Sequence, residues 1–193
     1  MEKAKNTLNN NTKRYFENYF SYVDEMIENI SNLKESRSIS NDFIGIFLPY
    51  NIASIKISKN ILEFSSNIDI QQIAAQIITQ GEEFLNFASL RRNECKILEN
   101  SNIAITLFSA LSQNITDNMF KDMKAAPLSE KTEFSYIKEM IPHRMGGIRL
   151  CETVLKFDIC PYLFEVANTT LQTSKEQIRQ LQLLNRLLFE NIR

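Results

Sequence analysis

Two stretches of the chain, FIGIFLPYNIASIKISKNILEF at 43–64 and YIKEMIPHRMGGIRLCETVLKF at 136–157, align without a gap at an offset of 93 residues. Each stretch has apolar residues spaced three and four apart, and each has a proline at the same place, Pro49 and Pro142. Apolar spacing of this kind is typical of amphipathic helices. Its recurrence at one offset indicates two copies of one supersecondary unit.

Working outward from these stretches, each copy is predicted to hold three helices. The expected helices lie near 12–34, 41–65 and 69–93, and near 102–125, 130–157 and 161–191. The copies themselves span about 12–93 and about 105–186. A three-helix unit leaves one long apolar face uncovered, and two such units bury these faces against each other. We therefore expect a single all-α domain over 1–193, with four long helices at its core.

The composition agrees with long helices. Glycine and proline number four each, too few for the many turns of an all-β fold, while 44% of the residues are hydrophobic. The net charge is −1 and no basic patch stands out, which argues against nucleic acid as a partner. No apolar run approaches the length that crosses a bilayer, and the first residues lack the apolar segment of a secretory signal. These features predict a cytoplasmic protein with no membrane partner.

The three cysteines, Cys95, Cys151 and Cys160, show no Cys-x-x-Cys spacing. An odd number of cysteines in a reducing compartment predicts free thiols that pack as small core residues.

The two prolines lie inside their helices rather than at the ends. A proline in a helix interior removes one backbone hydrogen bond, so Pro49 and Pro142 are predicted structural kinks that turn the following side chains inward. After the second proline, Gly146 and Gly147 are expected to let neighbouring helices approach closely. A further local signal is Asp69, which is predicted to cap the third helix.

The segments FSYIKEMIPHRMGGIRLCETVLKF at 134–157 and VANTTLQTSKEQIRQL at 166–181 resemble the bacterial domain of unknown function 305 family. The hallmark of that family is similar to F-I-x-x-M-I-P-H-H-x-x-A-I-x-M. A later helix of the family carries a glutamine and a glutamate, where this chain has Ser174 and Gln177. The resemblance implies a ferritin-like helical bundle, and some members of the family bind copper.

The chain departs from the hallmark at the paired histidines. These should fall at 143 and 144, where the chain has His143 and Arg144, and in the first copy at 50 and 51, where it has Tyr50 and Asn51. The resemblance therefore implies a fold that persists while most of the metal ligands have been replaced.

Copper is the candidate cofactor, and no other cofactor is predicted. Met140 and His143 are three residues apart on one helix face, Met145 is nearby, and Cys151 follows two turns later. Thioether, imidazole and thiolate ligands suit copper(I). The alternative is that the methionines fill the core, since Met at helical spacing usually does so.

No pattern of catalytic residues is present. A di-iron centre needs several inward glutamates and Glu-x-x-His motifs, whereas this chain has no such motif and only Glu139 four residues before its one histidine. We predict a non-catalytic helical-bundle protein with a largely degenerate metal site, acting in binding or structure. The alternative is a protein that binds copper, or another soft metal, through the remaining Met and His residues.

A protein partner, including a second copy of the chain, is the candidate partner. The aromatic-rich first helix with Tyr15, Tyr19 and Tyr22 is the surface on which it would dock. The alternative is that these rings are buried while their hydroxyls stay in contact with water.

Overall fold

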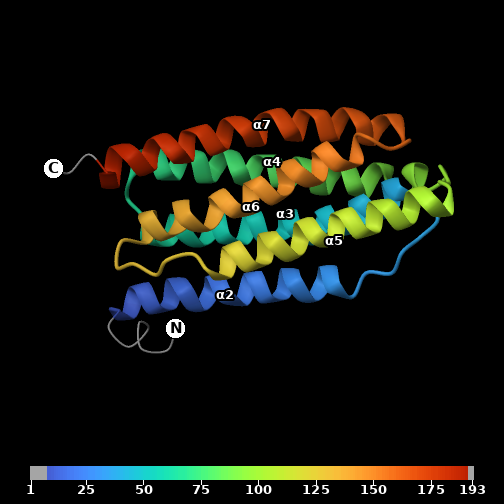
Figure 1. Cartoon of the computed structure of the whole chain (residues 1–193). Helices are drawn as coiled ribbons and strands as arrows, with labels where there is room; N and C mark the ends of the chain where they lie inside the picture. Colours follow the sequence, from blue (N-terminus) through green and yellow to red (C-terminus); the bar gives the residue numbers. More distant parts are fainter. Residues whose placement is uncertain (1–7, 191–193) are drawn as a thin grey trace.

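The computed structural model describes residues 8–190. Within these residues it is all-helical and has no strand, which confirms the all-α class (Figure 1). In chain order the elements are α2 (Asn10–Ser31), α3 (Ile39–Phe64), α4 (Ile68–Cys95), α5 (Asn102–Lys124), α6 (Thr132–Val154), α7 (Pro161–Asn185) and a π-helical turn, η1 (Arg186–Glu190). All six predicted helices are present, with ends close to those expected.

Local chemistry explains where the helices begin. Pro161 opens α7, where its missing N–H is not needed. The cap of α4 is Asn67, whose side chain accepts a hydrogen bond from the Ile70 N–H at 3.0 Å. The prediction that Asp69 caps this helix was therefore wrong. Asp69 instead lies in the first turn, where its charge is favourable beside the unpaired N–H groups of the helix end.

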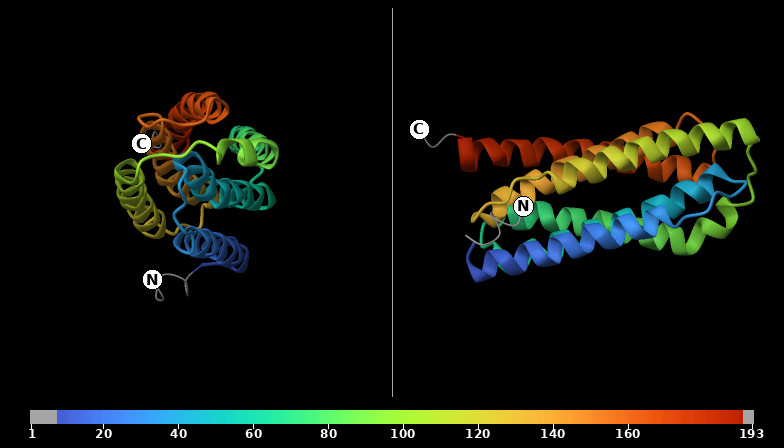
Figure 2. Two further views of the ribbon diagram at one scale, coloured as in Figure 1. Left: turned by 90° about the vertical axis from the view of Figure 1, so that its right-hand side faces the viewer. Right: turned by 60° about the horizontal axis from the view of Figure 1, so that its bottom comes forward.

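The bundle is arranged around α3 and α6, which pack against each other. Helix α3 also packs against α2 and α4, while α6 packs against α5 and α7, and α4 lies along α7 (Figure 2). The starts of α3 and α6 are 93 residues apart in the chain, and so are the starts of α4 and α7. Both Pro49 and Pro142 lie inside continuous helices, and the kinks stay a prediction.

The tyrosines of α2 lie mostly inside the bundle. Tyr15 and Tyr19 are fully buried, whereas Tyr22 is half-buried. The Tyr15 hydroxyl donates to Glu139 Oε2 at 2.5 Å, and the Tyr19 hydroxyl donates to the Met123 carbonyl at 2.9 Å. The alternative prediction, buried rings with hydroxyls in contact with water, holds for the rings of Tyr15 and Tyr19. Their hydroxyls, however, bond to protein groups rather than to water. These two side chains are thus not available for the docking surface that the sequence suggested.

The cysteines correct another expectation. Cys95 at the end of α4 and Cys160 just before α7 form a disulfide, with their Cα atoms 5.2 Å apart. The prediction of three free thiols was wrong for these two, because the packing of α4 along α7 brings together residues 65 positions apart. Cys151 is free and buried, as predicted. In the described part of the chain, no helix has the length and apolar character needed to span a membrane.

Candidate functional site

A buried polar cluster lies where α3 and α6 cross, and His143 is at its centre. The imidazole ring stacks on the Tyr50 ring with their centroids 4.1 Å apart and their planes within 6° of parallel. Its Nε2 lies 2.6 Å from the Ser54 Oγ, a hydrogen bond in which either atom can donate. The side chain of His143 is fully buried.

Small residues opposite the two rings make this crossing fit. A Cβ atom at Gly147 would lie 2.3 Å from the Tyr50 hydroxyl oxygen, so the tyrosine ring occupies the space that a side chain would need. The shorter His143 ring instead faces Ser54, which is large enough to bond to it. Gly146 admits the Met119 side chain of α5 in the same way. These contacts confirm that the two glycines allow close approach of neighbouring helices.

The environment of His143 keeps its imidazole neutral. Burial lowers the pKa of His143 well below its ordinary value, and the nearby Arg144 guanidinium lowers it further, against a smaller opposite effect of the Tyr50 backbone. Its Nδ1 makes no well-aligned hydrogen bond among residues 8–190, although the Tyr50 backbone lies close enough to the ring to affect its pKa. A neutral ring with one nitrogen unpartnered is able to act as a single ligand or as a packing element.

Arg144 is the largest fully buried side chain among the described residues. None of its three guanidinium nitrogens makes a well-aligned hydrogen bond in that part of the chain, but the guanidinium lies beside the Tyr50 hydroxyl and opposes the rise that burial causes in the pKa of Tyr50. The residue 93 positions earlier, Asn51, is equally buried, but its Nδ2 donates to the Phe47 carbonyl at 2.7 Å. A buried cation without an acidic partner destabilises a fold. Arg144 is therefore expected to lower stability, whereas Asn51 at the matching position of α3 has its hydrogen bond.

Two further titratable groups of α6 are buried nearby. Burial raises the pKa of Glu139 to about 8, although the hydrogen bond from Tyr15 acts in the opposite direction. Burial also raises the pKa of the Cys151 thiol to about 12, which keeps the thiolate form rare near neutral pH. The Tyr136 hydroxyl pairs with the Ser58 Oγ at 2.9 Å. The cluster therefore holds mostly neutral groups around one fixed cation.

The predicted metal ligands lie in this region with different exposures. Met140, His143 and Cys151 are fully buried, and Met145 is half-buried. Within the described chain, no group of three or more His, Cys, Asp or Glu side chains is placed to hold a metal ion. The assignment of copper to these residues stays a prediction. Sequence reasoning did not predict the burial of Arg144, because charged side chains are rarely fully buried.

A groove of about 660 Å³ runs between α4 and α7. Gln80 and Phe84 line it from α4, and Thr170 and Gln177 line it from α7. Gln80 Nε2 donates to the Thr170 carbonyl at 3.3 Å and so links the two walls. The size of the groove is in the range of small-molecule sites.

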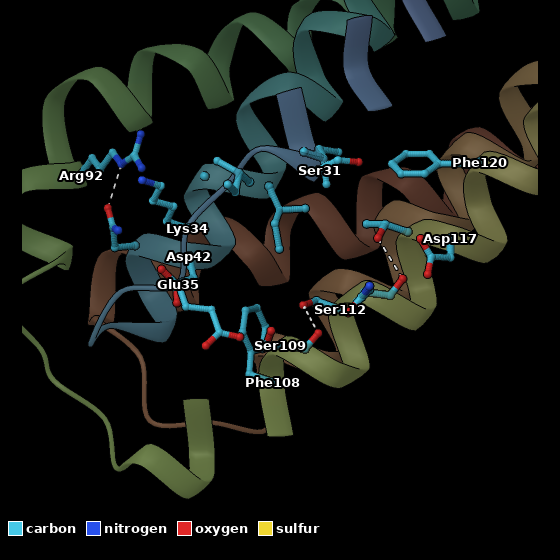
Figure 3. Close-up of a pocket in the computed structure, with 17 residues that line it drawn as sticks. Ser31, Lys34, Glu35, Asp42, Arg92, Phe108, Ser109, Ser112, Asp117 and Phe120 are labelled. Carbon is cyan, nitrogen blue, oxygen red and sulfur yellow. Dashed lines mark hydrogen bonds between the residues drawn. The ribbon is translucent and has the colours of Figure 1, made fainter. Parts of the chain in front are cut away.

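A second pocket, of about 310 Å³, lies between α2, α3 and α5 and is shown in Figure 3. On one side Arg92 of α4 donates through Nε to Asn41 Oδ1 at 2.9 Å. On the other side, the buried hydroxyls of Ser112 and Thr116 donate to carbonyls of their own helix. These two inner hydroxyls therefore have no free hydrogen to donate to a ligand.

Comparisons of the chain with protein-family models, with curated proteins and with solved structures found no match.

Proposed function

We propose that the chain is a non-catalytic helical bundle that acts in binding or structure, built from two three-helix repeats in a ferritin-like arrangement. The matched helix starts support the repeat, since α3 and α6, and likewise α4 and α7, begin 93 residues apart. The central pairing of α3 with α6 supports a bundle in which the repeats bury their faces together.

One observation carries the non-catalytic role: the enclosure of His143. Both its position under Tyr50 and its bond to Ser54 hold the imidazole inside the core. A general base must reach the proton that it removes, and a fully buried ring has no access to a substrate. In this proposal His143 stabilises the crossing of α3 and α6, where its counterpart in metal-binding relatives would hold an ion.

The alternative, binding of copper or another soft metal, is favoured by one specific observation. The unpartnered Nδ1 of His143 keeps a nitrogen available for a metal, and the buried thioether of Met140 lies one turn earlier on the same helix. Copper(I) accepts low coordination by imidazole and thioether groups. The high pKa of Cys151 weakens its part in such a site, because the thiolate is the metal ligand.

An anaerobic copper(I) titration distinguishes the two functions. The wild type is compared with His143→Ala and with His143→Gln, which keeps an amide able to bond to Ser54. We expect weak binding that neither substitution changes, together with a lower melting temperature for His143→Ala than for His143→Gln. Tight stoichiometric binding that both substitutions abolish would contradict the proposal and establish the copper alternative.

The location and partners of the chain stay predictions. A cytoplasmic location was expected, but the Cys95–Cys160 disulfide favours an oxidising compartment, where such bonds persist. A homodimer or another protein partner stays the candidate partner, on a surface other than the buried Tyr15 and Tyr19.

A further inference from the structure

The groove between α4 and α7 is elongated. Its walls extend from Ala75 to Phe84 on α4 and from Glu165 to Gln177 on α7. With a rise of about 1.5 Å per helical residue, the α7 wall is about 18 Å long. The groove therefore suits a chain-like ligand better than a compact ion.

Two buried carboxamides face this groove without complete hydrogen bonding. Gln177 is 1% exposed, and neither its Oε1 nor its Nε2 has a hydrogen-bond partner among residues 8–190. Gln80 is 8% exposed, and its Oε1 is likewise unpartnered there. Buried polar groups are rarely left unpaired in folded proteins, so these carboxamides need partners, which a ligand in the groove can supply. The lining hydroxyls of Thr169 and Thr173 already donate to helix carbonyls.

The groove is acidic at one end. Glu83 and Glu165 line it, both are exposed, and neither forms a salt bridge within the described chain. No lysine or arginine lines the groove. The Gln80–Thr170 hydrogen bond sets the register of the two helices, which places both glutamates on one side of that bond and Gln177 on the other.

We propose that the α4–α7 groove binds an elongated organic cation, an amine that carries an amide group at its other end. The ammonium group lies between the glutamate carboxylates at the acidic end. The aliphatic part lies along Phe84 and Val166. The amide offers both a donor and an acceptor, which is what the carboxamide of Gln177 lacks. This inference rests on the proposed binding role and names its ligand class.

The test is a calorimetric titration at low ionic strength with 8-aminooctanamide as the probe, whose extended chain with a hydrogen bond at each end is long enough to reach from Glu165 to Gln177. Octanamide is the matched analogue that lacks the ammonium group. We expect the aminoamide to bind and octanamide to bind at least tenfold more weakly. Added salt should weaken the binding of the aminoamide, because a charged pair near the surface is screened.

Variants locate the site. Glu165→Gln and Gln177→Leu should each weaken binding of 8-aminooctanamide about tenfold. The control is Glu176→Gln, since Glu176 lies on the same helix outside the groove and pairs with Arg179. Circular dichroism confirms that each variant is folded.

The proposal would be overturned if neither compound binds, if the two compounds bind equally well, or if both groove variants bind the amine as tightly as the wild type does. Such a result would leave the non-catalytic role standing, because that role is tested separately by the copper(I) titration of the His143 variants.

Discussion

The two halves of the bundle carry different chemistry at positions that are 93 residues apart. In the α3–α4 half, Phe43, Phe47 and Tyr50 form a continuous stack with centroids 4.8 and 4.6 Å apart, and Phe84 meets Phe47 edge-on at 5.0 Å. The corresponding residues of the α6–α7 half are Tyr136, Met140, His143 and Gln177.

The aromatic half is expected to contribute mainly to stability, and the polar half to binding. The aromatic half buries rings against rings, which adds packing energy beyond the area buried. The other half holds more of the unpartnered polar atoms found in the described chain, including those of Ser174 and Gln177, whereas α3 and α4 contribute the Tyr50 hydroxyl and Gln80 Oε1. Departures from good core packing of this kind are expected at functional positions rather than at random ones. We therefore expect substitutions in the first half to destabilise the fold, and some in the second half to stabilise it.

The largest expected effect comes from making the first half resemble the second. Phe84→Gln removes a buried ring and introduces a carboxamide at the position matching Gln177. The free energy of unfolding should fall by about 4 kcal/mol, as for removal of other buried aromatic rings. Urea denaturation followed by circular dichroism measures it. Gln177→Leu makes a change in the opposite direction, from a carboxamide to an apolar side chain, and it should leave stability unchanged or higher. A loss below about 1 kcal/mol for Phe84→Gln would remove the distinction between the halves.

The next effect tests the fit of the Tyr50 ring against α6. Gly147→Ala places a methyl group in the space of the Tyr50 hydroxyl, and we expect overpacking to lower the free energy of unfolding by about 2 kcal/mol. The matched control is Gly45→Ala in α3. There the new Cβ would be 3.5 Å from the nearest atom, an ordinary contact with Leu33, so helix propensity should make the change neutral or favourable. Equal losses for the two variants would contradict this interpretation.

A smaller effect of opposite sign is expected at Arg144. Arg144→Met removes an unpaired buried cation and keeps much of the apolar volume, so the free energy of unfolding should rise by about 1 kcal/mol. At the matching position, Asn51→Leu removes the hydrogen bond to the Phe47 carbonyl and should lower stability. The two melting temperatures should move in opposite directions. If Arg144→Met lowers the melting temperature, the guanidinium has a stabilising partner and the comparison fails at this position.

The last prediction concerns the slope of stability with pH. Glu139 takes the place matching Ile46, and its folded pKa of about 8 lies above the ordinary value of 4.5. The folded state binds the proton of Glu139 more tightly than the unfolded state does. The stabilisation that results is complete below about pH 4.5 and is lost as the pH rises to about 8. His143 acts in the opposite sense below pH 6.5, since its folded pKa is lowered and the unfolded state takes up the proton there.

Between pH 6.5 and 8, Glu139 is the only one of these two groups expected to make the free energy of unfolding depend on pH. Glu139→Gln keeps an acceptor for the Tyr15 hydroxyl and should flatten the decline in this range, as measured by urea denaturation at several pH values. An unchanged slope in the variant would show that Glu139 is ionised in the folded protein.

The helices were predictable because their signals are local. Apolar spacing and the repeated proline placed α3 and α6, and Pro161 marked the start of α7. The burial of Arg144 was not predicted, since charged side chains are rarely fully buried. The stack of His143 on Tyr50 depends on how two helices cross, which spacing along one helix does not contain.

The Cys95–Cys160 pairing has the same origin. Each cysteine is unremarkable in its own segment, and the bond depends on the end of α4 lying beside the start of α7. The choice of Asn67 over Asp69 as the cap shows a smaller uncertainty, in which of two nearby residues caps the helix, since both residue types cap helices well.

The disulfide has a mechanical consequence. Cys95 and Cys160 close a covalent ring of the chain that contains all of α5 and α6. If the protein is pulled from its two ends, tension passes through the bond and bypasses the segment between the two cysteines, which are 65 positions apart. In a single-molecule stretching experiment the oxidised chain should therefore extend less, by roughly 220 Å of contour length, than the reduced chain. Helices α5 and α6 would then respond to force only after reduction, which makes their mechanical resistance a reporter of the redox state around the protein.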